Sequence, residues 1–133
     1  MHLTASIKRA MVIAANEIAT IDGERVRTWA ECGERVARLA GALKGELGLG
    51  EGGRAAILAL NSDRYFELSH AMPWAGGVIV PINTRLAPGE VEYMLSDSGA
   101  ELLFVDVAFA AMAASLEERL PALRELIYLG DGE

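Results

Sequence analysis

Residues that build metal centres, disulfides and basic surfaces are scarce in this sequence. The single cysteine, Cys32, permits neither an internal disulfide nor a cysteine metal cluster, which is typical of a protein from a reducing compartment. The only histidines are His2 and His70, which excludes a histidine-rich metal site. Lysine and arginine number 12 against 19 aspartates and glutamates, and the net charge of −7 opposes nonspecific attraction to nucleic acid. We therefore expect no metal site and no nucleic-acid partner.

Long hydrophobic runs are also missing. No stretch approaches the roughly 20 apolar residues that a helix needs to cross a bilayer. Lys8 and Arg9 precede an apolar run over residues 10–15, but this run is shorter than the roughly 7 residues of a minimal signal-peptide core, and Glu17 follows it. The sequence predicts a cytoplasmic protein with no membrane span.

The remaining composition is that of a folded protein. The 133 residues are 52% hydrophobic, enough to bury a sizeable core, and they fit one domain or part of a larger one. Neither internal repeats nor low-complexity tracts interrupt the chain. We therefore expect an ordered chain throughout.

Residues 54–86 form the clearest structural unit in the sequence. An apolar run over residues 54–60 is bounded by glycines before it and by a polar pair after it, the pattern of a strand buried on both faces of a parallel sheet. Either Ser62 or Asn61 can cap a helix, and residues 78–82 form a second, β-branched run in which Pro81 predicts a strand that is short or near an edge. The larger side chains of the intervening helix recur at helical spacing, at Tyr65, Phe66, Ser69, Met72 and Pro73.

The N-terminal segment predicts a helix and a hairpin. Residues 4–15 carry apolar side chains at helical spacing and should form an amphipathic helix. Residues 18–21 and 25–28 flank Asp22 and Gly23, a pair that supplies the positive φ angles of a tight turn. This segment therefore predicts a small β-hairpin after the first helix.

A second, longer helix should follow the hairpin directly. Thr28 and Glu31 match a capping box, in which each side chain accepts a hydrogen bond from the other residue's backbone N–H. One apolar stripe then covers about five turns, formed by Trp29, Cys32, Val36, Leu39, Ala40, Leu43 and Leu47. Charged residues lie off the stripe on an expected solvent face, at Glu34, Arg35, Arg38 and Lys44. This pattern favours Cys32 as a buried structural thiol over a nucleophile.

The rest of the chain alternates helices and strands. Residues 88–97 predict a helix with Pro88 in the first turn, where a missing N–H costs nothing, and with a buried set of Val91, Met94 and Leu95. Residues 101–106 and 126–129 are short apolar runs typical of strands, and residues 108–120 between them predict an amphipathic helix. The alternation predicts an α/β fold with a mainly parallel sheet, flanking helices and a small N-terminal β-hairpin.

No local motif carries a reaction. The glycines within residues 45–53 follow a helix and precede a strand, the reverse of a phosphate-binding loop, so we interpret them as a helix stop and turn. His70 lies inside the central helix, where a structural histidine is favoured over a general base. Asn61 and Asp106 follow strands, where parallel sheets place ligands, but one polar residue at each strand does not define a site.

Four segments of the sequence follow one another in a recognisable order. The first is the hairpin with TWAE and then RVARLAGAL, and the second is GRAAILALNS. The third is AGGVIVPINTRL, and the fourth is GEVEYMLSDSGAELLFVD. Together they resemble the start of the acyl-CoA synthetases, members of the adenylate-forming (AMP-binding) superfamily. The resemblance covers nearly the whole chain, from about Leu3 to Leu129, and the combination is more specific than any one segment.

The resemblance implies both a fold and an activity. The fold is the large N-terminal domain of the adenylate-forming enzymes, of which residues 1–133 would be a single partial domain. The implied enzyme activates a carboxylic acid, with a fatty acid as the expected class, by reaction with ATP to an acyl-adenylate and pyrophosphate. It then transfers the acyl group to the thiol of coenzyme A. Such an enzyme needs ATP, Mg²⁺ and CoA, with charge stabilisation around the phosphates as its main task.

Several parts of the family pattern are missing from the sequence. The family's Ser/Thr/Gly-rich phosphate loop ending in Pro-Lys-Gly, its adenine and Mg²⁺ motifs, and its small C-terminal domain with the catalytic lysine are absent from the 133 residues. We expect these parts downstream of Glu133. Residues 1–133 would then be an N-terminal fragment that is inactive alone, with no catalytic residue and no bound cofactor.

One site residue can be transferred from the family. In some members the arginine of P-x-N-x-R-L faces the phosphates of the CoA nucleotide, and the corresponding residue here is Arg85. The alternative is an ordinary surface arginine after a strand.

Two expectations concern assembly. A parallel sheet without its remaining strands would leave an unpaired edge and apolar faces, which favour pairing with another copy. We therefore expect a homodimer or a swapped assembly. The alternative to a ligase fragment is a self-standing, non-catalytic α/β module that acts in oligomer assembly.

Overall fold

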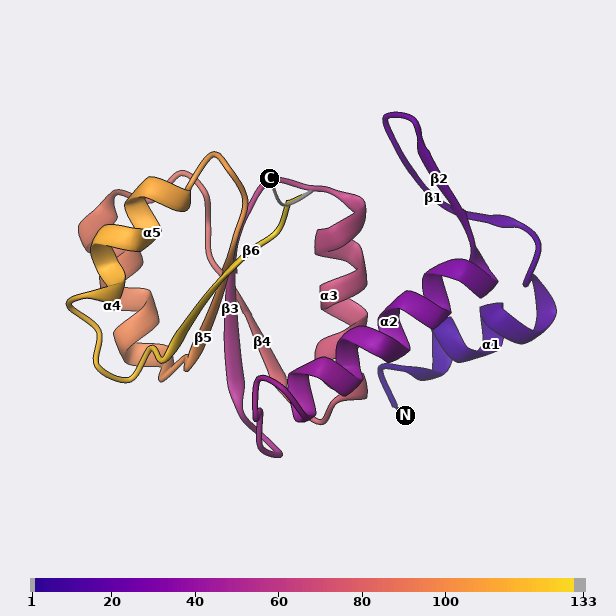
Figure 1. Ribbon diagram of the computed structural model, residues 1–133, viewed down its shortest axis with the longest axis horizontal. Coiled ribbons are helices and arrows are strands. Elements are labelled where there is room, and N and C mark those ends of the chain that lie inside the picture. The colour runs from indigo at the N-terminus through magenta and orange to yellow at the C-terminus, as the bar shows by residue number, and fades with distance from the viewer. Residues whose placement is uncertain (1, 131–133) are drawn as a thin grey trace. The chain divides into compact units, whose positions relative to one another are not determined.

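The computed structural model describes residues 2–130, which contain a four-stranded sheet, a two-stranded hairpin and several helices (Figure 1). The chain divides into two compact units. Unit 1 comprises residues 1–51 and 61–77, and unit 2 comprises residues 52–60 and 78–133. None of the helices in the described part of the chain has the length and apolar character to span a membrane.

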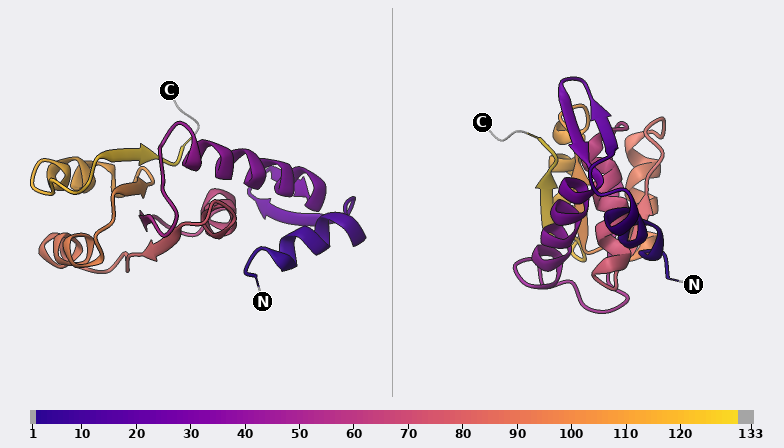
Figure 2. Two further views of the ribbon diagram at one scale, coloured as in Figure 1. Left: turned by 90° about the horizontal axis from the view of Figure 1, so that it is seen from below. Right: turned by 90° about the vertical axis from the view of Figure 1, so that its right-hand side faces the viewer.

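Unit 1 contains three helices and the hairpin. The helices are α1 (Ala5–Ile13), α2 (Trp29–Lys44) and α3 (Asp63–Trp74), and the strands are β1 (Ile18–Asp22) and β2 (Arg25–Thr28). The hairpin strands pair antiparallel, and Gly23 in their turn has a positive φ of 58°. In Figures 1 and 2 the hairpin projects beyond α1 and α2 of its unit. The predicted first helix and hairpin are confirmed.

Helix α2 begins at the predicted cap, and it ends at Lys44, directly before the first of the glycines that were interpreted as a helix stop. The Thr28 hydroxyl accepts a hydrogen bond from the Glu31 N–H at 3.3 Å, one half of the predicted capping box. The predicted stripe is buried at four positions, Cys32, Val36, Ala40 and Leu43. Leu47 lies beyond the helix, because the helix ends at Lys44 and the Leu47 N–H donates to the Ala42 carbonyl in the following turn. The stripe is therefore shorter than predicted.

Helix α3 buries a face that the sequence pattern did not predict. Its cap is Ser62, one of the two predicted candidates, because the Ser62 hydroxyl accepts from the Tyr65 N–H at 3.1 Å. The buried residues are Asp63, Glu67, Leu68, Ala71 and Met72, so only Met72 of the predicted positions is fully buried. Aromatic side chains at 65 and 66 are half-buried instead. The pattern failed because two carboxylates, which favour the surface when they are unpaired, occupy the inner face.

Unit 2 is built on the parallel sheet. Its strands are β3 (Arg54–Leu58), β4 (Val78–Pro81), β5 (Leu102–Val105) and β6 (Glu125–Tyr128), in the order β4-β3-β5-β6 with every neighbouring pair parallel. Central β5 is buried at all four positions, as a strand covered on both faces should be. The edge position predicted from Pro81 is confirmed, since an edge strand tolerates a residue without an N–H.

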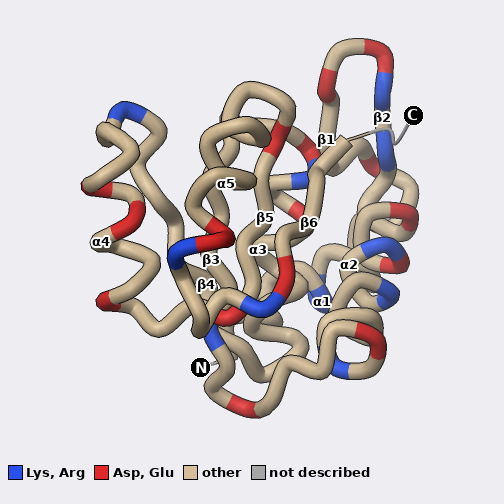
Figure 3. The backbone as a smooth tube through the Cα atoms, turned by 60° about the vertical axis from the view of Figure 1, so that its left-hand side comes forward, with Lys and Arg blue, Asp and Glu red and all other residues tan. Residues whose placement is uncertain are grey.

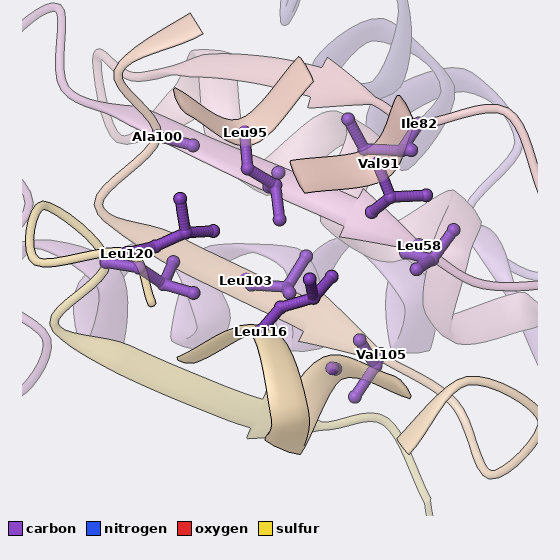
Figure 4. Packing of buried hydrophobic residues seen from close by; sticks show 12 residues of the cluster. Leu58, Ile82, Val91, Leu95, Ala100, Leu103, Val105, Leu116 and Leu120 are labelled. Carbon is purple, nitrogen blue, oxygen red and sulfur yellow. The ribbon is translucent and has the colours of Figure 1, made fainter. Parts of the chain in front are cut away.

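One face of this sheet packs against two helices. Helices α4 (Pro88–Ser98) and α5 (Ala110–Glu117) lie on the same side of the sheet (Figures 1 and 2). Figure 4 shows the core between them, in which Leu95 of α4, Leu116 of α5 and Leu103 of β5 belong to one buried cluster. Full burial of each such side chain contributes roughly 1.5–3 kcal/mol. This cluster is the main apolar core of unit 2.

Two details of these helices differ from the predictions. Helix α5 is shorter than the predicted 108–120. Met94 is 37% exposed, so its predicted burial is wrong, whereas Val91 and Leu95 are buried as expected. The helical repeat places 91 and 95 one turn apart on the inner face, and 94 lies beside that face.

Gly99 and Gly41 should respond oppositely to alanine. Gly99 ends α4 in the left-handed conformation, with φ 68°, and an added Cβ would meet nothing within 4 Å. Gly99→Ala should therefore lower the free energy of unfolding by about 1 kcal/mol through backbone strain alone. Gly41 lies within α2 with equally open surroundings, so Gly41→Ala should raise it by up to about 1 kcal/mol. Urea unfolding measures both, and shifts in the same direction would contradict this account.

Candidate functional site

Asp106 and Arg85, two polar residues that the sequence singled out, both follow strands of the parallel sheet. Asp106 follows β5, and its Oδ2 accepts a hydrogen bond from the Leu60 N–H at 2.7 Å. Its Oδ1 accepts from the Ala108 N–H at 3.1 Å. Both carboxylate oxygens are therefore engaged by backbone, and they join the end of the β3 segment to the turn after β5. Asp106 therefore has a structural role here, since it links these two segments of the chain.

Arg85 lies in the turn after β4. The Asn83 Oδ1 accepts from the Arg85 N–H at 2.9 Å, and the Asn83 carbonyl accepts from the Leu86 N–H at 3.2 Å, so the asparagine shapes the turn. Arg85 itself is exposed. An exposed guanidinium beside the carboxyl ends of parallel strands suits a phosphate contact, and it equally suits a surface arginine. The CoA contact therefore remains a prediction.

A second polar centre lies in unit 1, where the sequence did not predict one. We call it the arginine–carboxylate cluster, formed by Asp22, Arg25, Arg27, Arg35, Asp63 and Glu67. Figure 3 shows basic residues along β2, the strand that supplies two of its arginines. Three arginines face three carboxylates, so the formal charge within the cluster is 3 − 3 = 0.

Asp63 is the centre of the cluster. Its side chain is 1% exposed. Arg25 donates through Nε to Oδ2 at 2.9 Å and through Nη2 to Oδ1 at 2.8 Å, a two-pronged contact that matches a carboxylate. Arg27 donates to Oδ2 from the same strand at 2.5 Å. The Asp63 N–H donates to Asp22 Oδ2 at 3.0 Å, and Asp22 accepts in turn from Arg25 at 3.1 Å. These contacts attach the hairpin to the first turn of α3.

Glu67 extends the cluster by one helical turn. Residues 63 and 67 share a face of α3 because they are four positions apart. Arg35 of α2 donates through Nε to Glu67 Oε1 at 2.9 Å, and Arg27 Nη1 lies 3.9 Å from the same oxygen. The Arg35 side chain is 39% exposed, as expected of the solvent face, but its guanidinium also pairs with a buried carboxylate of α3, which the sequence did not predict.

The cluster shifts ionisation in the direction expected of a structural network. Hydrogen bonds, first from Arg25 and then from Arg27, hold the pKa of Asp63 well below its usual value against the opposing effect of burial. The hydrogen bond to Glu67 raises the pKa of Arg35 above its already high value. Asp63 therefore stays charged and paired near neutral pH, so it is not poised to transfer a proton.

The remaining reactive side chains have structural surroundings. Cys32 is buried, and burial first, with the nearby Glu67 charge second, raises the pKa of its thiol, which disfavours the thiolate that a nucleophile requires. His70 Nδ1 lies 3.0 Å from the Phe66 carbonyl, and the centroid of its ring lies 4.4 Å from that of the Phe66 ring, with the two planes tilted by 48°. His2 is exposed. The structural interpretation of Cys32 and His70 agrees with these surroundings.

A hollow of about 390 Å³ lies between β1 and the start of α3. Its polar lining includes Thr20, Asp22, Asn61, Ser62 and Asp63. Both acidic residues are engaged by arginines, and Ser62 caps α3. Thr20 Oγ1 is buried without a hydrogen-bond partner among the described residues. The hollow therefore offers few groups that are available to a ligand.

The comparisons with known proteins identify the family. Residues 8–132 match the model of the AMP-binding enzymes. The chain belongs to this family. It is 38% identical over 120 residues to a feruloyl-CoA synthase from an Amycolatopsis species, a match that covers 87% of this chain and 24% of that protein. The resemblance found in the sequence is thereby confirmed.

Solved structures of the family share the fold. The crystal structure of the anthranilate CoA ligase AuaEII in complex with anthranoyl-AMP matches with a TM-score of 0.92 and 28% identity, covering 98% of this chain and 25% of that one. O-succinylbenzoate CoA synthetase (MenE) from Bacillus subtilis, in complex with ATP and magnesium ion, matches with a TM-score of 0.80 and 26% identity, covering 92% and 32%. The chain thus spans about a quarter to a third of the length of these relatives.

The cofactors of this family's enzymes require metal ligands and groups that bind phosphate. Within residues 2–130, no three or more His, Cys, Asp and Glu side chains gather to hold a metal ion. The glycine-rich segment lies between α2 and β3, the wrong order for a phosphate loop. The described residues thus form neither a cluster of metal ligands nor a phosphate loop, and Arg85 offers a single charge for a phosphate.

Proposed function

We propose that residues 1–133 are the N-terminal part of an ATP-dependent acid–thiol ligase. The observation that supports this most strongly is the family match over residues 8–132, combined with a span of about a quarter of a CoA-ligase relative. In the parent enzyme, a carboxylate oxygen would attack the α-phosphorus of ATP and release pyrophosphate. The CoA thiol would then attack the acyl carbon of the acyl-adenylate and release AMP.

In this proposal the chain is scaffold for a site completed by other parts of the parent protein. The parallel sheet and the cluster-bound hairpin form rigid supports, and Arg85 contributes a cation toward the CoA phosphates. We propose a fatty acid as the substrate class and a cytoplasmic location. The acids named for two of the relatives, ferulate and anthranilate, are aromatic, so aromatic acids are the comparison substrates.

The isolated 133-residue polypeptide should not form acyl-adenylates. Because its described residues contain no phosphate loop, carboxylate-dependent ATP–pyrophosphate exchange should stay at the level of a no-protein blank for fatty and aromatic acids alike. Binding of ATP and of CoA, followed by calorimetry, should be equally absent. Robust exchange by this polypeptide would overturn the proposed division of the site.

The matched experiment uses the reading frame beyond codon 133. We expect it to continue into a Ser/Thr/Gly-rich segment that ends in Lys-Gly, and the protein that includes this segment should catalyse the exchange. An extended protein without exchange activity for any tested acid would count against the ligase proposal.

A second candidate is a non-catalytic module that acts in oligomer assembly. The sheet supports it, because β4 and β6 each have one neighbour and so leave a backbone edge unpaired among the described strands. We propose that the 133-residue chain self-associates as a homodimer or a swapped assembly. A stop codon directly after Glu133 would favour this candidate over the ligase part.

A further inference from the structure

The hairpin of unit 1 turns its polar face inward and its apolar face toward solvent, the reverse of the usual arrangement. Residues directly opposite in an antiparallel pair share a face, and Asp22 lies opposite Arg25 while Thr20 lies opposite Arg27. This polar face carries the arginine–carboxylate cluster. Ile21 lies opposite Val26 and therefore occupies the other face. A one-sided sheet normally turns its apolar face inward, so this hairpin buries charges and exposes hydrophobic side chains.

The outward hairpin face is strongly exposed. Ile21 is 69% exposed and Val26 is 49% exposed. Ile18 is 58% exposed, and the register shift between Ile18 and Thr20 allows it to join the same face despite its odd spacing from Ile21. We call Ile18, Ile21 and Val26 the hairpin face.

Further exposed hydrophobic side chains lie in and just before helix α1. Of the twelve large hydrophobic residues exposed in the described part of the chain, six lie within residues 3–26: Leu3, Val12, Ile13, Ile18, Ile21 and Val26. Half of the exposed large hydrophobic residues in the described part of the chain thus lie in its first fifth. A stable dimer buries about 800 Å² per partner, and the hairpin face can supply part of that area.

The hairpin face is also held in place before any partner arrives. Arg25 and Arg27 attach β2 to Asp63, and Asp22 attaches β1 to the Asp63 N–H. Such buried ionic contacts select one arrangement more than they add stability. A surface fixed in this way loses little conformational entropy on binding.

We propose that the hairpin face is the isologous interface through which two copies of this chain associate. Charge favours a second copy as the occupant. The only charged residues of α1 are Lys8 and Arg9, whereas Glu17 and Glu24 beside the hairpin strands are exposed and acidic. A two-fold axis lets Lys8 and Arg9 of each copy approach the exposed Glu17 and Glu24 of the other, so each contact forms twice. This inference rests on the self-association proposed above and assigns a surface to it.

The test compares matched lysine variants by light scattering at high protein concentration. The double variant Ile21→Lys/Val26→Lys places charges on the hairpin face without touching the cluster, and should weaken dimerisation by about 100-fold. The control Val107→Lys changes a residue of unit 2 that is 76% exposed and should remain dimeric. Circular dichroism and the urea midpoint establish that each variant is folded.

A covalent trap gives an independent measurement. Val26→Cys should form an intermolecular disulfide under mild oxidation, because two-fold symmetry brings like faces together, while Val107→Cys should not; native Cys32 is buried. A wild-type chain that is monomeric at all concentrations would overturn both the self-association and its surface. A dimer that persists in the folded lysine variant, without cross-linking at residue 26, would overturn the surface alone.

Discussion

Asp63→Asn should lower the free energy of unfolding of this chain by about 3–5 kcal/mol, the usual cost of removing one partner from a buried ion pair. The substitution keeps the size of the side chain and removes its charge. The two arginines that now share the Asp63 carboxylate, Arg25 and Arg27, would face a neutral amide whose nitrogen cannot accept their hydrogen bonds. Equilibrium unfolding in urea measures the change, and an effect below about 1 kcal/mol would show that the cluster contributes little.

Glu34→Gln is the matched control. Glu34 pairs with Arg38 one turn later on α2, and the two side chains are 64% and 73% exposed. Exposed pairs of this kind contribute roughly 0–1 kcal/mol because water and salt screen them. The same chemical change should therefore have almost no effect at this position. Equal effects at both positions would contradict the importance of burial.

The pH dependence of the free energy of unfolding is a second test of the stabilisation by the Asp63 carboxylate. Its pKa is lowered in the folded state, so the folded carboxylate holds its charge at a pH where the unfolded one, with an ordinary pKa of about 3.9, is already protonated. The stabilisation is present above about pH 4 and is lost progressively as the pH falls further toward the lowered folded-state value. The wild-type chain should therefore lose its advantage over Asp63→Asn below about pH 4, and a constant difference down to strongly acidic pH would contradict this.

Leu103→Ala should cost about 2–5 kcal/mol, the range for deleting a buried leucine side chain and leaving a cavity. Leu103 lies in central strand β5 with 0% exposure, between residues of both covering helices (Figure 4). Because total stability is only about 5–15 kcal/mol, this one substitution removes a large share of it. The volume-conserving Leu103→Met should cost less than about 1.5 kcal/mol.

Val107→Ala is the control for the core substitution. Val107 follows the same strand but is 76% exposed, so the loss of its methyl groups should change the free energy of unfolding by less than about 0.5 kcal/mol. Urea unfolding with an unchanged slope would show that only stability differs. Similar costs for the two alanine variants would mean that the face of β5 toward α4 and α5 is not the core of unit 2.

Local patterns predicted the elements well for identifiable reasons. A strand buried on both faces needs a continuous apolar run, which both β3 and β5 have. The helix cap at residue 61 or 62 was predictable because it depends on neighbouring residues alone, and Ser62 is the one that caps α3. The same local rules placed Pro81 in an edge strand, and the sheet order agrees.

The candidate site was less predictable because it depends on distant residues. Asp63 and Glu67, four positions apart, are consistent with one helix face, and the alternation of Arg25 with Arg27 is consistent with one strand face. Those spacings were the available signal, but a carboxylate in the first turn of a helix is ordinarily explained by the helix dipole. Arg25 lies 38 positions from Asp63, and no local rule pairs them. The pairing of Arg35 with Glu67 was missed for the same reason, since the two residues are 32 positions apart.

The sequence by itself determined the family, the alternation of strands and helices and the hairpin turn, since all three are recorded in residues that are adjacent or one helical turn apart. Only the tertiary structure decided the strand order β4-β3-β5-β6, the burial of two carboxylates against three arginines and the outward direction of Ile21 and Val26. The physical reason is that a period-two strand pattern states that two faces differ but not which one is buried. Charge pairing with α2 and α3 makes that choice here, and it turns the apolar face of the hairpin toward solvent.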